Sequence, residues 1–351
     1  MAPFLVISPV GPSMICILSK AHLELTTESV MDWLSFWRVP AIRMNVEDLT
    51  AASLSVFIDR SGVNLSWPAG KIRFDPTRIK VVWYRRWGSY LHTALNGQVL
   101  FGDAAQENWQ DNTINSALHL QRELRTVSEF VFHLLSSARW LSDPNTGIVN
   151  KLRVLKLAAE CELDIPATSV SNDRASLSAF IEKYGRVVTK AVGEALICEF
   201  KGTSFVTYTS LVEQDTVNDR QSSRVFPTLL QECLNKQYEV RVFYLDGLLY
   251  SMAIFSQSNE QTAVDFRRYQ FQRPNRTVPY QLPGDISSKL TMLLQRLGLE
   301  TASIDLVKTV DGRHVFLEVN PMGQFGMVSF PCNYHLERAV AAALVKRLYH
   351  E

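Results

Sequence analysis

Two carboxylates in the C-terminal part of the chain have the types and spacing that favour metal chemistry. They lie in the run SIDLVKTVDGRHVFLEVNP, in which two strand-like segments flank Asp311-Gly312. This dipeptide favours a two-residue type I′ turn, and counting outward from such a turn brings Asp305 opposite Glu318. Like charges that face each other destabilise a hairpin unless a cation lies between them.

Asn320 adds an amide oxygen to this pair. It follows Glu318 by two residues, so both side chains lie on the same face of the strand. Oxygen ligands of this kind suit Mg²⁺, which takes carboxylates together with phosphates and waters. The alternative is a solvated face on which the acids flank Lys308 or Arg313, but an unpaired charge is costly within these apolar runs. The register predicts a magnesium site at Asp305, Glu318 and Asn320.

Two lysines are candidates for binding phosphate. Lys190 lies within the apolar run RVVTKAV, where an ammonium group needs a partner that a nucleotide phosphate would supply. A lysine that extends its amine to water from an edge strand is an equally good reading of the same residues. Lys151, in the first turn of an expected helix, has the weaker case because most such lysines are exposed.

A further set of charged residues follows in the next two segments. Glu239 and Arg241 alternate onto one face of a strand and either contact ribose and phosphate or pair with each other. Arg267 and Arg268, in VDFRRY, form a basic spot for an anionic intermediate or a peptide acid, with a surface salt bridge as the alternative.

Several common catalytic motifs do not occur in the sequence. It contains no GxxxxGK[ST], no GxGxxG and no HExxH, so readings as a P-loop, Rossmann or zinc-protease protein lose their main support. The net charge of +1 over 351 residues gives no global field for nucleic acid or an anionic membrane. The five cysteines are scattered, which favours free thiols in a reducing cytoplasm.

The length predicts more than one domain. Residues 1–149 mix strand-like runs (Phe4 to Ser8, Ser53 to Ile58, Ile79 to Tyr84) with helical patterns near 28–37 and 106–140, as in an α/β domain. The apolar start, with early prolines and no basic segment, predicts a buried strand and not a signal peptide. Asp143-Pro144-Asn145 predicts a turn before the next domain.

The remaining elements are expected in two further domains, 150–234 and 235–351. Asn150 is expected to cap a helix, and ALICEF and FVTYTS are expected to form a hairpin. Further hairpins are expected at Asp246-Gly247 and Asp311-Gly312, with a helix between them capped by Asp285 and ended by Gly298.

From about 150 to 325 these motifs resemble the ATP-grasp superfamily, on the stretches VVTKAV, LLQECL and SIDLVKTVDGRHVFLEVNP. The resemblance implies a mixed α/β (α+β) fold in which an N-terminal pre-ATP-grasp domain precedes central and C-terminal domains that sandwich ATP. It implies phosphate binding by Lys151 and Lys190 and Mg²⁺ binding by Asp305, Glu318 and Asn320. It also implies an adenine hinge formed by Gln231, Glu232 and Leu234, largely through backbone contacts. Glu239 is a further candidate for binding the nucleotide.

The stretches WYRRW, DFRRY and NPMGQFGMVSFPCNYHLE resemble the peptide maturases that make graspetides, the microviridin-like ribosomal peptides, with the grasp-with-spasm branch nearest. Such enzymes phosphorylate a Glu or Asp side chain of a precursor peptide, and a Thr or Ser hydroxyl or a Lys amine of the same peptide displaces the phosphate. The resemblance implies a leader-binding hairpin at 195–209, a homodimer, and charge stabilisation by Lys190, Arg241 and Arg267.

Two alternatives stay open from the sequence. One is an ATP-grasp ligase that adds free amino acids to a peptide or protein, and the other is a non-catalytic relative that binds peptides or nucleotides. Gly323 and Gly326 are expected to let the backbone approach the transferred phosphate closely.

Overall fold

The chain divides into two compact units. In the computed structural model they comprise residues 1–147 with 335–351, and residues 148–334. The structure describes residues 12–22, 24–51, 54–69, 72–87, 113–193, 195, 197–200, 203–212, 224–257, 260–268 and 272–349. No helix in these ranges combines the length and the apolar character needed to cross a membrane.

The first unit contains a four-stranded parallel sheet in the order β2-β1-β7-β8. Its strands are β1 Met14–Ser19, β2 Ala41–Asn45, β7 Ile79–Tyr84 and β8 Arg139–Leu141. Every residue of β1 is buried, as expected for a strand in the middle of a parallel sheet. The predicted strand at Phe4 to Ser8 lies outside the described residues.

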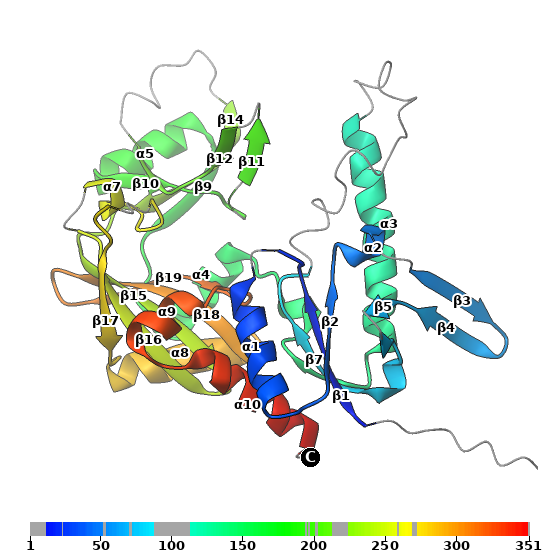
Figure 1. The fold of residues 1–351 in the computed structure, drawn as a ribbon. Helices are drawn as coiled ribbons and strands as arrows, with labels where there is room; N and C mark the ends of the chain where they lie inside the picture. Colours follow the sequence, from blue (N-terminus) through cyan, green and yellow to red (C-terminus); the bar gives the residue numbers. More distant parts are fainter. Residues whose placement is uncertain are drawn as a thin grey trace, which may run out of the picture. The chain divides into compact units, whose positions relative to one another are not determined.

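Smaller elements complete this unit (Figure 1). They are α1 Leu25–Phe36, α2 Asp48–Ala51, the hairpins β3 Ser55–Asp59 with β4 Gly62–Ser66 and β5 Pro68–Ala69 with β6 Ile72–Arg73, α3 Thr113–Leu134, and the 3₁₀ turns Pro76–Arg78 and Pro144–Thr146. The last helix, α10 Leu336–Tyr349, also belongs here and packs against α1, β1 and β7. Residues 335–351 cluster with the first unit, and the three-domain division expected from the sequence stays a prediction.

The second unit contains two sheets. The smaller is four-stranded in the order β13-β10-β14-β9 and is covered by helix α5. Its elements are β9 Thr168–Asp173, α5 Arg174–Tyr184, β10 Val187–Thr189, β13 Ser210–Val212 and β14 Arg224–Glu232. The expected hairpin is present as β11 Ile197–Phe200 and β12 Thr203–Val206.

The larger sheet is antiparallel in the order β17-β16-β15-β18-β19. Its strands are β15 Lys236–Leu245, β16 Leu248–Phe255, β17 Arg276–Tyr280, β18 Thr301–Thr309 and β19 His314–Asn320. The helices around it are α4 Lys151–Glu160, α7 Glu260–Ala263, α8 Gly284–Arg296 and α9 Gly326–Cys332. The order of these elements and the two sheets agree with the mixed α/β class expected from the sequence.

Alternate residues divide the larger sheet into two faces. Val240 and Val242 of β15 and Ile304 of β18 join a buried cluster with apolar residues of α4 and α8. The intervening residues Arg241 and Asp305 must point to the opposite face, because successive side chains of a strand alternate. The burial of one face therefore fixes which side chains the other face presents.

Particular residues set the ends of helices α4 and α8. The Asn150 side chain accepts a hydrogen bond of 3.0 Å from the Arg153 N–H, which confirms the predicted cap of α4. The predicted cap at Asp285 is wrong, because α8 begins at Gly284 after Pro283 and has no side-chain cap. Gly298 has φ +68° and ends this helix as predicted.

The two Asp-Gly turns differ from each other. At Asp246-Gly247 both residues have positive φ (47° and 88°) and Leu245 pairs with Leu248, as a two-residue type I′ turn requires. At Asp311-Gly312 only the glycine has positive φ (90°), and Lys308 pairs with His314. The predicted two-residue turn is wrong there: the loop has three residues, a type I turn closed by a left-handed glycine.

A β-bulge compensates for this longer loop. The register of β18 and β19 shifts between Leu306, which pairs with Phe316, and Asp305, which pairs with Glu318. Leu317 is the extra residue. Phe316 and Val319 both lie in the buried cluster, so Leu317 and Glu318 lie on the other face. Without the bulge the three-residue loop would place Glu318 on the core face.

Candidate functional site

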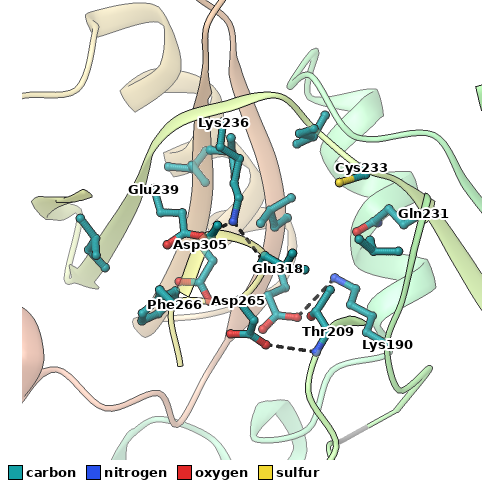
Figure 2. A pocket seen from close by; sticks show the side chains of 18 of the residues that line it. Lys190, Thr209, Gln231, Cys233, Lys236, Glu239, Asp265, Phe266, Asp305 and Glu318 are labelled. Carbon is teal, nitrogen blue, oxygen red and sulfur yellow. Dashed lines mark hydrogen bonds and ion pairs between the residues drawn. The ribbon is translucent and has the colours of Figure 1, made fainter. Parts of the chain in front are cut away.

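A pocket lies within the second unit, between the face of the larger sheet that is opposite the buried cluster and residues of β10 and β14, the middle strands of the smaller sheet. Its empty space is about 1030 Å³ when the open mouth is included. Figure 2 shows side chains from both sheets pointing into it. Polar lining residues include Lys190, Gln231, Lys236, Glu239, Arg241, Asp265, Arg267, Asp305 and Glu318, and apolar ones include Val188, Leu234, Ile254, Val264 and Leu306.

One row of side chains crosses the floor of the pocket. Arg241 pairs with Asp305 across β15 and β18, and Asp305 pairs with Glu318 across β18 and β19. The Arg241 Nη1 atom lies 2.6 Å from each carboxylate oxygen of Asp305. The predicted pairing of the two acids is therefore present, and a guanidinium group beside them offsets part of their repulsion.

Glu318 is surrounded by cations. Its Oε2 atom lies 3.6 Å from Lys151 Nζ and 3.7 Å from Lys190 Nζ. Burial by itself raises the pKa of Glu318, but Lys190, Lys151, Arg267 and Arg241 outweigh it, so the pKa lies below its usual range. The carboxylate is therefore held ionised, as a metal ligand must be.

The sequence suggested that Lys190 lies in the middle of a strand. In the structure it instead follows the last residue of β10. Its side chain is only 12% exposed, which excludes the reading as an edge lysine that reaches into water. Burial lowers the pKa of Lys190, and Glu318 partly offsets that change. Lys151 is the first residue of α4 and is half-buried beside the same carboxylate.

Asn320 lies at the end of the same row of β19 but differs in its surroundings. It is exposed, pairs with Ser303 across the strands, and its Oδ1 atom accepts a 3.1 Å hydrogen bond from the Met322 N–H. Within the described ranges, no three His, Cys, Asp or Glu side chains form a metal-binding group. The donor set is two carboxylates and one amide, which fits a magnesium ion that keeps waters and phosphate oxygens as its other ligands.

Glu239 lies two residues before Arg241 on the same face of β15. It is 6% exposed, and its Oε1 atom accepts a hydrogen bond of 2.5 Å from Lys236 Nζ. Its Oε2 atom and the Nε atom of Arg241 are buried without a hydrogen-bond partner in the described part of the chain. Burial raises the pKa of Glu239 despite Lys236. Unpaired buried polar atoms that line a pocket are available to water or to a ligand.

The connection between β14 and β15 borders the pocket, as the hinge prediction requires. Glu232 and Cys233 donate their N–H groups to the carbonyl oxygens of Ala167 (2.9 Å) and Arg186 (3.0 Å). These two N–H groups are therefore used within the protein. Leu234 comes after both bonds and lines the pocket, so its backbone is the better placed to meet a ligand.

Gln231 has a structural partner as well as a place in the pocket lining. Its side-chain amide donates a 2.9 Å hydrogen bond to Thr168 Oγ1, and the residue is 3% exposed. This bond joins the end of β14 to β9, so the side chain of Gln231 is used within the protein.

Arg267 is oriented by Asp265. The two side chains form a two-point ion pair, with Nε to Oδ1 at 2.9 Å and Nη2 to Oδ2 at 2.7 Å. Asp265 is 5% exposed and also accepts the Thr209 N–H at 3.1 Å, a bond drawn in Figure 2. Hydrogen bonding to Asp265 raises the pKa of Arg267, so the guanidinium group stays positively charged.

Gly323 has a role that differs from the expected one. A Cβ atom at this position would lie 2.3 Å from Ser303 Cβ and 3.2 Å from Arg241 Nη2. The close approach that needs a glycine is therefore to β18 and to Arg241. A close approach of this backbone to a phosphate stays a prediction.

Lys236, Asp265 and Thr209 are among the pocket residues that sequence reasoning missed. Lys236 lies three residues before Glu239, a spacing that has no special meaning in a strand. Asp265 stands in the run VDFRRY, where a single acid beside two arginines has no spacing that distinguishes it from an exposed residue. Thr209 contributes a backbone N–H group, for which no sequence signal exists.

Neither a protein-family model nor a curated protein matches this chain. Solved structures do match over nearly its whole length. A RiPP-associated ATP-grasp ligase from Chryseobacterium gregarium, in complex with ADP and a leader and core peptide, is 24% identical with a TM-score of 0.76, and 96% of each chain is covered.

Two further structures are similar. The macrocyclase MdnC from Microcystis aeruginosa MRC, bound with precursor peptide MdnA, is 21% identical with a TM-score of 0.75, covering 95% of this chain and 99% of that one. The ATP-grasp ligase PsnB, complexed with a phosphomimetic variant of a minimal precursor, Mg and ADP, is 17% identical with a TM-score of 0.69, covering 96% and 99%. This chain has the ATP-grasp ligase fold.

Proposed function

We propose that the protein is an ATP-dependent ligase that joins side chains within a ribosomally made precursor peptide. The observation that carries this proposal is the row Arg241, Asp305 and Glu318 on the pocket floor, with Lys151 and Lys190 beside Glu318. Cations and ionised oxygen ligands held together at the floor of a pocket are what phosphoryl transfer requires.

In this proposal the nucleotide lies in the pocket with its base at the hinge. The backbone of Leu234 contacts adenine beside Ile254 and Leu306, with Gln231 and Glu232 fixing the hinge. Glu239, with its unpaired buried oxygen, accepts a hydrogen bond from a ribose hydroxyl. Lys190 and Lys151 bind phosphate oxygens, since both ammonium groups lie within 4 Å of the carboxylate that marks the phosphate end.

Asp305, Glu318 and Asn320 would hold Mg²⁺ at the same end of the pocket. Bound there, the ion would neutralise charge on the phosphate oxygens of the nucleotide. The ionised state of Glu318, maintained by four nearby cations, supports this assignment.

The proposed chemistry needs no protein nucleophile. A Glu or Asp carboxylate of the precursor attacks the γ-phosphorus of ATP and ADP leaves, which gives an acyl phosphate. A Thr or Ser hydroxyl or a Lys amine of the same peptide then attacks the acyl carbon and releases inorganic phosphate. Arg241, Arg267 and Lys190 stabilise the negative charge on the transferred phosphoryl oxygens. Each bond formed removes one water from the peptide.

The partners of the similar structures support a peptide substrate. One of those proteins is complexed with ADP and a leader and core peptide, and another is bound with its precursor peptide. In the present chain the β11–β12 hairpin is the proposed leader-binding element. The family resemblance further suggests a homodimer, and the free thiols of Cys16, Cys161, Cys233 and Cys332 favour a reducing cytoplasm.

Intact-mass spectrometry tests the proposal. A Glu/Asp- and Thr/Ser/Lys-containing precursor encoded beside this protein is incubated with the protein, ATP and Mg²⁺. Stepwise loss of water that depends on ATP is expected, and alkaline cleavage then distinguishes esters from amides. A gain of residue masses would instead identify a ligase that adds amino acids, and binding of ATP with no change in peptide mass would leave only a binding role.

A further inference from the structure

Two segments that are far apart in the sequence meet at the side of the pocket. Residues 207–210 lead from the β11–β12 hairpin into β13, and residues 265–268 follow α7. The Thr209 N–H donates to Asp265 Oδ2 at 3.1 Å, and Arg268 Nη2 donates to Ser210 Oγ at 2.9 Å. Consecutive residues of the 207–210 segment therefore bind the first and the last residue of the 265–268 segment.

The two neighbouring arginines have different surroundings. Arg267 lines the pocket and forms the two-point ion pair with Asp265. Arg268 is absent from the pocket lining and binds the 207–210 segment, with its guanidinium carbon 5.4 Å from the centroid of the Tyr208 ring. A guanidinium group over an aromatic face is attracted by the ring electrons.

One nitrogen atom of the Arg268 guanidinium group lacks a hydrogen bond within the described residues. Its Nε atom is buried and has no hydrogen-bond partner in the described part of the chain. Leaving a buried donor unpaired costs free energy, so the fold gains less from Arg268 than a fully bonded arginine would provide. The position of Arg268 is better explained by how its side chain holds neighbouring residues in place.

Hydrogen bonds of Asp265 connect Arg268 with Arg267. The Arg268 N–H donates to the Asp265 carbonyl oxygen at 3.1 Å, and the Arg267 N–H donates to Asp265 Oδ1 at 3.0 Å. The same carboxylate accepts Thr209, whose neighbours Tyr208 and Ser210 are both held by Arg268. Loss of Arg268 would release the 207–210 segment and with it one of the bonds that orient Asp265.

We propose that Arg268 is a positioning residue: by holding Tyr208 and Ser210 it keeps Thr209 on Asp265 and thereby fixes the guanidinium group of Arg267 at the pocket. The inference rests on the proposed function for the role of Arg267. It assigns the two arginines of VDFRRY to different tasks, Arg267 to the reacting anion and Arg268 to the arrangement of the segments.

The test combines amide hydrogen exchange with steady-state kinetics for Arg268→Ala, Arg268→Lys and a control, Arg276→Ala. Arg276 lies 5.2 Å from the Phe255 ring in the same unit, so its loss removes an arginine–aromatic contact of the same kind away from the 265–268 segment. Arg268→Ala is expected to raise exchange in peptides covering 207–212 and 263–268. We also expect kcat for precursor-dependent ATP turnover to fall about tenfold to 100-fold, with KM for ATP within about twofold.

Arg268→Lys keeps the charge and the ring contact, so partial recovery of kcat supports the proposal. Unchanged exchange at 207–212 in Arg268→Ala, or the same loss of kcat in Arg276→Ala, would overturn it. The exchange measurement needs no precursor. Failure of the proposed function would appear as no turnover by the wild-type protein, whereas failure of this inference would appear as unchanged exchange.

Discussion

The pocket has a half carried by strands and a half carried by connections, and the two are held in place by different means. Glu239, Arg241, Asp305 and Glu318 stand on adjacent antiparallel strands, where backbone pairing fixes their spacing. Lys190 follows β10, Leu234 precedes β15 and Arg267 follows α7. The side chains of Lys190 and Arg267 are positioned by ion pairs with Glu318 and Asp265. The first half cannot adjust without a register change, whereas the second half can move by small changes in the connections.

The two halves of the pocket therefore suit different functions. The strand half offers the fixed oxygen ligands that a metal and a transferring phosphoryl group need, because catalysis of phosphoryl transfer is largely a matter of positioning. In the proposed function, the connection half would contact groups that enter and leave, such as the base, the phosphates and a peptide carboxylate. Substitutions in the two halves should therefore have different consequences.

The largest effect is expected in the strand half, at Glu318. Glu318→Gln keeps the shape and removes the charge, so turnover of ATP should fall about 100-fold to 1000-fold. The fold should persist, because the pairing with Asp305 depends on the backbone. Single-turnover ADP formation, measured beside circular dichroism, checks both expectations, and near wild-type turnover would remove Glu318 from the proposed magnesium site.

In the connection half, Lys190→Ala should raise KM for ATP about tenfold to 100-fold, because it removes a charge-assisted contact with phosphate. Lys156→Ala is a matched control, since Lys156 is an exposed lysine that pairs with Glu160 one helical turn away on α4. Equal KM values for the two variants would contradict the role of Lys190.

Gly323→Ala perturbs the strand half, because residue 323 lies against Ser303 and Arg241 on the same face of the sheet as Asp305. Its Cβ atom would lie 2.3 Å from Ser303 Cβ, so the unfolding free energy should fall by about 1 to 3 kcal/mol. Adding Ser303→Gly removes the clashing side chain and should restore part of this loss. Denaturant unfolding measures both, and a double variant no more stable than Gly323→Ala would show that the strain has another source.

The smallest expected effect concerns the stability of the strand half at different pH values. Burial raises the pKa of Glu239, so the stability that it contributes is complete below the ordinary pKa of glutamate and is lost as the pH rises through the raised value. Glu239→Gln imitates the protonated form. It should raise the melting temperature more at about pH 8 than at about pH 4, and an equal rise at both would contradict the assignment.

The same comparison explains what the sequence could predict. The strand half was accessible because alternation and Asp-Gly turns are local signals, and the pairing of Asp305 with Glu318 was predicted correctly. The route to it was wrong in two compensating ways: the turn has one more residue than expected, and the bulge at Leu317 restores the pairing. Neither feature has a clear local signal, since burial of Phe316 and Val319 on one face decides the bulge.

The connection half was less accessible. Lys190 and Arg267 were identified by residue type, but Asp265 and Lys236 became visible only as their partners in space. A backbone donor such as the Thr209 N–H leaves no trace in residue identity. Contacts between segments that are far apart in the chain depend on the whole fold, and a pattern within a short window does not contain them.

The central claim is that the pocket couples ATP cleavage to bond formation within a peptide. The most direct test counts ADP and lost water in the same reaction, by chromatography of the nucleotide and intact mass of the precursor. We expect one ADP for each water lost, with both stopped in Glu318→Gln. Water loss without ADP, or formation of AMP in place of ADP, would contradict the acyl-phosphate route and the account of the pocket built on it.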